Sequence, residues 1–243
     1  MSQKQYFRHF PTIDFDLKND GNLIKAKDIF RNIRVGANAE DAISGYELYY
    51  VEDQDRPDVT ATKLYGDATL YWLFWMVNSH LAVHSDWPKS QRVLERFIKR
   101  KYSGKSLVAP FQSDIVSNSD SKFFQGEKVV GSTSSAFGFV TKIDPTNQQI
   151  VLNDITGQFQ VGETVTGSNS SKSFIISSVR NFSDSPHHYE DSEGNKTTIS
   201  NGNTPVSNFD YEQKFNDDKR SIRYINVRYV PQLIREFKSF IGS

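Results

Sequence analysis

The residues of this sequence that are able to do catalytic or metal chemistry are few, and their spacing does not suit it. His187 and His188 form the one histidine pair. Neighbouring residues on a strand face opposite sides, so these two rings do not chelate one ion without a distorted backbone. The sequence has no Gly-x-Ser-x-Gly, His-Glu-x-x-His or P-loop pattern. We therefore predict no enzyme activity, no metal and no cofactor.

A group of aromatic residues is better suited to the recognition of a partner than to catalysis. Five of them lie within 23 positions: Tyr65, Tyr71, Trp72, Trp75 and Trp87. Large rigid side chains of this type are favoured at the energetic centres of protein interfaces. The alternative is that most of them fill the core of their own domain. From helical spacing we assign Trp72 and Phe74 to one side and Tyr71 and Trp75 to another.

Two predicted helices carry these aromatic residues. Residues 49–51 form a short β-prone run, and Pro57 then suits the first turn of a helix that ends at Gly66 in a left-handed cap. Asp67 is an expected N-cap for a second helix, Ala68 to Asn78. That helix is apolar on all sides from Leu70 to Val77, so it has to be covered on more than one side.

A third helix is expected from about residue 89 to 101, with Val93, Leu94, Phe97 and Ile98 on one face. The basic run 99–101 closes it. Cations there complement the negative end of the helix dipole. We favour this interpretation over a nucleic-acid contact, because no aromatic platform accompanies the run.

The middle of the chain contains an internal repeat. The segment 126–135 (GEKVVGSTSS) recurs 36 positions later as 162–171 (GETVTGSNSS). These segments lie between predicted strands and open no helix, so they are not phosphate-binding loops. Short strands and turn signals at this spacing predict a small antiparallel sheet or barrel. We expect a compact pseudo-twofold β-barrel, inserted into the rest of the fold.

The C-terminal third returns to mixed structure. A hairpin is expected to pair 187–190 with 196–199, followed by a short helix over 211–219. Alternation then predicts a half-buried strand over 222–230. Pro231 opens a last amphipathic helix, whose apolar stripe is Leu233, Ile234, Phe237, Phe240 and Ile241.

Composition limits the partners. The chain of 243 residues has 29 Lys+Arg and 29 Asp+Glu, so no net charge favours nucleic acid or an anionic membrane. It has no cysteine, which fits a reducing cytosol. We expect a soluble protein with neither a signal peptide nor a membrane span, because the longest apolar run is far too short. Residues 1–25 are expected to be an arm that docks on a partner or on its own domain, or else a partly ordered terminus.

Several short motifs follow one another in the first third of the chain: Ile29-Phe30-Arg31-Asn32, Tyr49-Tyr50, Arg56-Pro57, Leu64-Tyr65-Gly66, Leu70-Tyr71-Trp72 and Asn78. A strand, a helix, a Tyr-Gly turn and a helix ending in Asn occur in the order of a LysM module. More closely, the sequence resembles the LysM-like baseplate wedge protein (protein fifty-three) of T-even-type contractile-tailed phages. The resemblance covers roughly residues 26–102 well and the C-terminal segment more loosely.

The resemblance implies an α+β fold with a LysM-like βααβ body, extra helices and terminal arms, in which the strand over 222–230 would pair with 49–51. The barrel of two repeats, predicted from the repeat itself, would be an insertion in this body. The expected parts are an arm (1–25), the wedge body (26–108 and 182–243) and the β-repeat domain (109–181). Its implied role is structural, within a hetero-oligomeric ring of wedge proteins and neighbouring wedges in the virion tail baseplate, assembled in the host cytoplasm. The alternative is a LysM module that binds peptidoglycan or N-acetylglucosamine polymers. The interface residues we predict are Phe30, Arg31, Asn32, Arg56, Tyr65, Tyr71, Trp72, Trp75, Trp87, Arg220 and Phe237.

Overall fold

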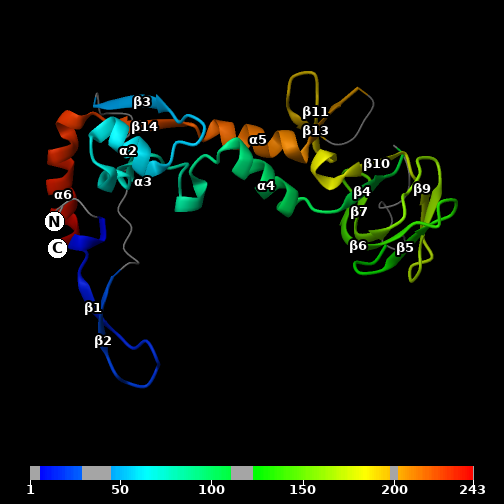
Figure 1. Cartoon of the computed structure of the whole chain (residues 1–243), viewed down its shortest axis with the longest axis horizontal. Coiled ribbons are helices and arrows are strands. Elements are labelled where there is room, and N and C mark those ends of the chain that lie inside the picture. The colour runs from blue at the N-terminus through cyan, green and yellow to red at the C-terminus, as the bar shows by residue number, and fades with distance from the viewer. Residues whose placement is uncertain (1–5, 29–44, 111–122, 198–201, 243) are drawn as a thin grey trace. The chain divides into compact units, whose positions relative to one another are not determined.

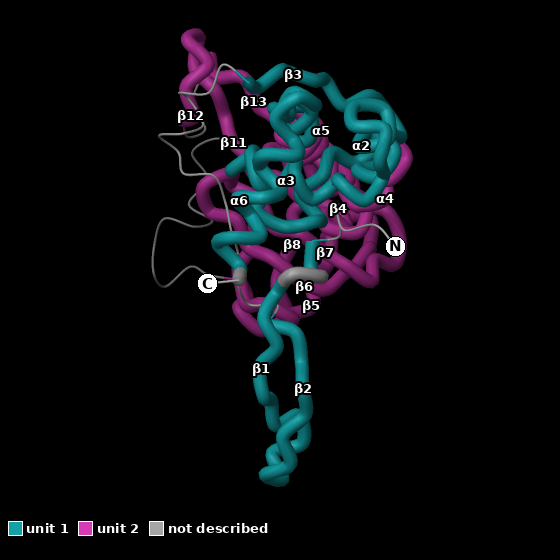
Figure 2. The backbone as a smooth tube through the Cα atoms, turned by 90° about the vertical axis from the view of Figure 1, so that its left-hand side faces the viewer, with its two compact units in different colours: residues 1–91, 216–243 teal, residues 92–215 magenta. Residues whose placement is uncertain are grey.

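The computed structural model describes residues 6–28, 45–110, 123–197 and 202–242, and shows a mixed α+β fold with several antiparallel sheets (Figure 1). The chain divides into two compact units (Figure 2): unit 1 comprises residues 1–91 and 216–243, and unit 2 comprises residues 92–215. The predicted insertion, 109–181, lies inside unit 2. Among the described residues, no helix combines the length and the apolar character needed to cross a bilayer.

Unit 1 is built around an antiparallel strand pair and short helices. Its elements in chain order are η1 (Tyr6–His9), β1 (Thr12–Phe15), β2 (Ile24–Lys27), β3 (Tyr46–Tyr50), α2 (Pro57–Tyr65), η2 (Ala68–Leu70), α3 (Leu73–Val77), η3 (His84–Asp86), β14 (Ser221–Ile225), η5 (Val227–Tyr229) and α6 (Val230–Gly242). Helices α4 (Gln91–Lys101) and α5 (Asn208–Asp218) contain the two points where the chain changes unit.

The predicted pairing of the central strand with a C-terminal strand is confirmed. Strand β3 pairs antiparallel with β14, with Ser221 opposite Tyr50 and Ile225 opposite Tyr46. Helix α2 begins at Pro57 and ends at Gly66, whose φ of 70° is left-handed and whose N–H donates to the Thr62 carbonyl at 3.0 Å. Both signals predicted from the sequence therefore act where expected.

The second predicted helix, Ala68–Asn78, is not continuous. It is divided into the 3-10 turn η2 and the short helix α3, with Tyr71 and Trp72 between them. Asp67 does cap the first piece, since its carboxylate accepts from the Thr69 N–H at 2.9 Å. Trp72 and Phe74 lie in separate cores and do not share a side as predicted, because residues two apart on a helical turn do not face the same way.

Two apolar clusters fill unit 1. One contains Trp72 and Phe237 together with Phe10 from the N-terminal segment. The other contains Phe74 and Trp87 beneath β3 and β14. Leu73, Phe74 and Val77 are at most 1% exposed, so the apolar α3 is covered on several sides by the chain itself, and little of it remains for a partner.

Strand β14 is shorter than the alternation 222–230 predicts. It ends at Ile225, and Asn226 then accepts a hydrogen bond from the Arg228 N–H to cap η5. The apolar positions shift phase at this point, from Ile222 and Tyr224 to Val227 and Tyr229. This shift marks the end of the strand.

Unit 2 contains an open sheet instead of the closed barrel that we predicted. Its seven strands run in the order β10-β4-β7-β6-β5-β8-β9, all neighbours antiparallel, and the sheet curls into a half-barrel (Figure 1). The strands are β4 (Lys105–Val108), β5 (Lys128–Gly131), β6 (Phe137–Asp144), β7 (Gln149–Thr156), β8 (Thr164–Gly167), β9 (Ser173–Ile175) and β10 (Ser178–Asn181). Among the described strands β9 and β10 remain the two edges.

The repeat generates a local twofold relation within this sheet. Strand β5 pairs antiparallel with β8, and Val130 lies opposite Thr166, its own counterpart 36 positions on. The pseudo-twofold axis therefore passes between these two residues. Each repeat also completes the turn of the other, because Glu127 accepts from the N–H groups of Asn169 and Ser170, and Glu163 from those of Thr133 and Ser134.

The rest of unit 2 includes the predicted hairpin. Strand β11 (Pro186–Glu190) pairs with β12 (Lys196–Thr197) across Gly194, which has a φ of 81°. Strand β11 also pairs with β13 (Thr204–Ser207), which the sequence did not indicate. A separate apolar cluster holds the helices of this unit through Leu94, Ile98, Tyr102, Val151, Phe182, Phe97 and Phe209.

Candidate interaction surface

The N-terminal segment forms a β-hairpin, which we call the hairpin arm (residues 12–27). Strands β1 and β2 pair antiparallel, with Ile13 opposite Ala26 and Phe15 opposite Ile24. The arm projects from the rest of unit 1 in both views (Figures 1 and 2). Among the described residues these two strands form a sheet of their own.

The arm is amphipathic. Opposed residues of an antiparallel pair point to the same face, and successive residues alternate between faces. One face therefore carries the four apolar side chains of Ile13, Phe15, Ile24 and Ala26. The other carries Thr12, Lys27 and an exposed ion pair, Asp14–Lys25, at 2.7 Å.

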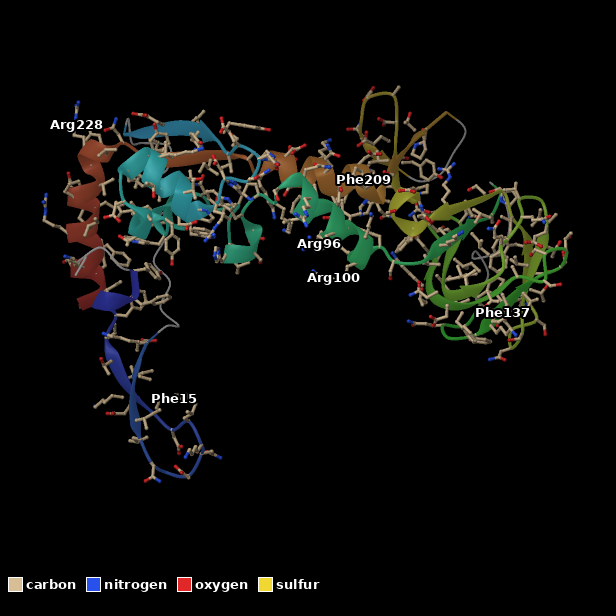
Figure 3. All side chains as sticks on the ribbon, in the orientation of Figure 1. Phe15, Arg96, Arg100, Phe137, Phe209 and Arg228 are labelled. Atoms are coloured by element: carbon tan, nitrogen blue, oxygen red, sulfur yellow. The ribbon has the colours of Figure 1, made fainter. Side chains whose placement is uncertain are left out.

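The described residues leave the apolar face of the arm uncovered. Phe15 is 42% exposed and Ile24 47%, and Leu17 and Leu23 in the connecting loop are exposed further. Figure 3 labels Phe15 on the projecting strand. An isolated two-stranded hairpin is marginally stable in water. An uncovered apolar face on such an element is typical of a surface that is buried in an assembly.

The base of the arm is firmly held. Phe10 is only 1% exposed and lies in the cluster with Trp72 and Phe237. The Tyr6 ring contacts the rings of Phe10 at 4.8 Å and of Phe237 at 5.4 Å between centroids. Lys27 donates to the Phe10 carbonyl at 2.7 Å. The predicted arm therefore begins at an aromatic anchor in its own unit.

A smaller aromatic surface is formed where α3 meets η3. Tyr71 is 39% exposed, and its ring contacts Trp75 edge-on at 6.0 Å and His84 at 6.4 Å. The Trp75 Nε1–H donates to the Val83 carbonyl at 3.0 Å, and the Val83 side chain is 57% exposed. Tyr71 and Trp75 thus share a face, as the spacing indicated.

The other predicted interface residues are placed as follows. Trp72, Trp87 and Phe237 are 6%, 7% and 2% exposed, which leaves little of their surface for a partner. Arg56 is exposed and pairs with Asp58 at 3.1 Å. Phe30, Arg31 and Asn32 lie outside the described residues. As interface residues, all eleven stay predictions.

Arg220 has a different environment from the one expected of an interface side chain. It is 9% exposed, and its guanidinium donates to the Asp217 carboxylate at 3.0 Å and to the carbonyl groups of Val51 and Lys89. Five donors in a fixed planar arrangement suit this multiple contact. In unit 1 it fastens the start of β14 to the loop after β3.

Tyr65 lines a surface pocket of about 340 Å³ in unit 1. Its hydroxyl accepts from the Ile225 N–H at 3.2 Å, and burial raises its pKa. The walls are mainly apolar, from Leu70 and Val230 among others, and Arg235 and Lys238 contribute cations. Apolar walls with a few polar groups are typical of a binding surface.

The two adjacent histidines do lie together, contrary to the expectation from strand geometry. The pairing of β11 is irregular between Pro186 and His188, and the Nδ1 atoms of His187 and His188 are 2.9 Å apart. Burial, with the neighbouring His188, lowers the pKa of His187, whose ring stacks on Tyr211 at 3.8 Å. Among the described residues no group of three ligands suitable for a metal is present.

The hairpin within the arm is the main feature that sequence reasoning missed. Its signal was present in the alternation of Ile13-Asp14-Phe15-Asp16-Leu17, followed by the turn dipeptide Asp20-Gly21. Asp16 accepts from the N–H groups of Asp20 and Gly21, and the hydrogen bond from Gly21 is the main cause of its lowered pKa. The sequence therefore contains the alternation of apolar and polar residues that predicts a strand, followed by a turn that predicts a hairpin.

Comparison with known proteins shows what the N-terminal half of the chain is similar to. Residues 6–123 match the family described as base plate wedge protein 53. The chain is similar to phage baseplate wedge proteins. The match begins at the aromatic anchor of the hairpin arm and includes β3, α2, α3 and α4. The resemblance predicted from the sequence is therefore confirmed.

A curated relative points to the same family. The baseplate wedge protein gp53 of Enterobacteria phage T4 is 31% identical over 101 residues, which are 40% of this chain. The chain spans about half the length of that relative, 50%. The wedge family match ends before β5, so the repeat-containing sheet lies almost entirely outside it. The matches give no support to the carbohydrate-binding alternative.

Proposed function

We propose that this protein is a structural subunit of a phage tail baseplate wedge, where it binds other wedge subunits and helps to join neighbouring wedges around the hub. Its place is the tail baseplate of the virion. The observation that carries the proposal is the wedge family match over residues 6–123, which starts at the anchor of the hairpin arm. The role is one of assembly, and its chemistry is the burial of apolar surface between proteins.

The fold of unit 1 supports this role. The order β3, α2, α3, β14, with β3 and β14 antiparallel, is the order that a LysM-like βααβ body requires. In our proposal this body is the rigid part, and the hairpin arm is the part that reaches a neighbouring subunit. Covering Phe15 and Ile24 in an interface would remove their apolar surface from water, at about 25 cal/mol for each Å².

The experiment is complementation of a phage that lacks this gene. The test variant is Phe15→Ser/Ile24→Ser, which alters the apolar face of the arm. The matched control is Asp14→Ser/Lys25→Ser, which alters the polar face of the same two strands. We expect wild-type protein and the control in purified virions, and the apolar-face variant to be absent, with the plaque titre reduced by about 100-fold or more.

Circular dichroism of each purified chain serves to show that the variants fold. If the apolar-face variant enters virions as well as wild type does, the arm is not the contact that we propose. If wild-type protein itself is missing from purified virions, the assignment to the baseplate fails.

A further inference from the structure

Helix α4 carries a line of cations that neither the fold nor the proposed function explains. We call Arg92, Arg96, Lys99 and Arg100 the basic stripe. All four side chains are exposed, and none has an ion pair or hydrogen bond to the described residues. At 100° per residue they lie within an arc of about 100°, over a length of about 12 Å. Figure 3 labels Arg96 and Arg100 on this helix.

The rest of α4 is used in packing, which fixes the stripe in place. Leu94 and Ile98 are 2% and 1% exposed, in the cluster that contains Phe182 and Phe209. Lys101 is separate from the stripe, because its ammonium pairs with the buried Glu212 at 2.6 Å. The helix is therefore held by one face and presents its cations on another.

The helix dipole accounts for only part of the stripe. Cations near the C-terminus of a helix are stabilising, which suits Lys99 and Arg100. Arg92 is the second residue of α4, at the positive end of the dipole, where a cation is unfavourable. Like charges at i, i+4, such as Arg92 with Arg96 and Arg96 with Arg100, cost a few tenths of a kcal/mol each. Glu95 is the one carboxylate of α4, and it is exposed, three residues from Arg92 and four from Lys99. The helix therefore carries more cations than its dipole and its own carboxylate account for.

We infer that the basic stripe docks an acidic α-helix of a partner protein. Cations at i, i+4 and i+8 match carboxylates with the same spacing on a facing helix, and three of the four are arginines, which bind carboxylates through two parallel hydrogen bonds. Val93, 46% exposed, lies beside the stripe and offers an apolar contact. No exposed aromatic platform for nucleotide bases accompanies it on α4, since Phe97 is half-buried beneath Lys101.

The inference rests on the proposed function for the source of the partner, a neighbouring protein of the assembly. It concerns a different surface from the hairpin arm. A binding assay on the purified full chain can therefore fail while the virion experiment succeeds, and the reverse also holds.

The probe is a fluorescent, alanine-based helical peptide of 24 residues with Glu at every fourth position. The comparison peptide has Gln at the same positions. At 50 mM NaCl we expect the Glu peptide to bind at least about tenfold more tightly than the Gln peptide, and to be released as salt is raised to 300 mM. Anisotropy of the labelled peptide measures both.

Two charge variants make the test specific. Arg92→Glu/Arg96→Glu/Arg100→Glu is expected to lose the binding of the Glu peptide. Arg180→Glu/Lys214→Glu/Arg228→Glu changes the net charge equally at exposed positions elsewhere and is expected to retain it. Arg96→Ala/Arg100→Ala replaces the first variant if circular dichroism shows that it is unfolded.

Three results would overturn the inference. Equal binding of the two peptides would remove the role of carboxylates. Equal loss in both charge variants would reduce the effect to net charge. Tighter binding of a 20-base-pair DNA duplex or of phosphatidylserine vesicles through the stripe would make the occupant a nucleic acid or a membrane instead.

Discussion

At the scale of single residues, the two repeats of unit 2 depend on two carboxylates. Glu127 and Glu163 are 2% and 5% exposed, and each lies in the turn of the other repeat. Burial raises the pKa of Glu163, but the hydrogen bonds from the N–H groups of Ser134, Gln160 and Thr133 outweigh it, so the pKa is lowered. The folded state thus favours the ionised form.

This sets the direction of a pH effect. Because the pKa of Glu163 is lower in the folded chain, its contribution is present above about pH 4.5 and is lost as the pH falls through the folded value. We expect Glu163→Gln to cost unit 2 about 1–3 kcal/mol at pH 7. Urea denaturation measures it, and the difference from wild type is expected to shrink below about pH 4.5. A difference that is independent of pH would contradict the assignment.

Glycine is required beside each of these carboxylates. A Cβ at Gly131 would lie 2.7 Å from Glu163 Oε2, and one at Gly167 would lie 2.6 Å from Glu127 Oε2. The sequence made these glycines visible as members of the repeat. Each glycine is required by a contact with a carboxylate far along the chain, Glu163 for Gly131 (32 positions) and Glu127 for Gly167 (40 positions), and no local pattern contains such a contact.

At the scale of elements, signals carried by one or two residues predicted structure well. Pro57 and Gly66 set the ends of α2, and the 36-residue offset predicted the repeat. Whether a predicted helix is continuous was harder to predict. The apolar run Leu70–Val77 contains no signal that divides a helix, because the division depends on packing into two tertiary cores. Closure of a sheet into a barrel likewise depends on its edge strands, and β9 and β10 stay open among the described strands.

Part of the candidate interaction surface was predictable from local spacing in the sequence. Tyr71 and Trp75 share a face because they are four residues apart. Their neighbour Trp72 belongs instead to a buried cluster, and the composition of the segment did not separate the two cases. To predict the hairpin arm, one has to recognise alternating apolar residues in a segment that is rich in charged residues.

The side-chain amide of Asn78 attaches the end of α3 to β14 by hydrogen bonds. Asn78 is 3% exposed, donates to the carbonyl groups of Phe74 and Arg223, and accepts from the Arg223 N–H at 2.8 Å. We expect Asn78→Ala to cost about 1–3 kcal/mol, because the N–H and the carbonyl group of Arg223 each lose a hydrogen bond to the amide. Ser79→Ala, at the exposed next position, is the control and is expected to stay within about 0.5 kcal/mol. Equal effects in chemical denaturation would show that the amide is unimportant.

At the scale of the whole molecule, each unit has its own apolar cores. Those of unit 1 contain Phe237 and Phe74, and those of unit 2 contain Leu152 and Ile98. Separate cores allow separate cooperative transitions. A single free energy of unfolding does not then describe the chain.

We therefore expect two transitions in calorimetry of the purified protein. Asn78→Ala is expected to lower the midpoint of one, and Glu163→Gln that of the other, because each change weakens the core of one unit only. A single transition that both variants shift equally would show that the two units unfold together.

The exchange of carboxylates across the twofold relation has a consequence for the history and engineering of the sheet. In one repeat taken alone, the N–H groups of the turn have no carboxylate to bind, and the glutamate has no turn to accept from. A second identical copy would supply both through the same contacts, with β5 pairing against itself about the axis at Val130. The twofold relation includes β5 and β6 of one repeat and β8 and β9 of the other. A segment that contains one repeat alone is therefore expected to associate as a symmetric pair through β5, with the contacts that join the two repeats of this chain.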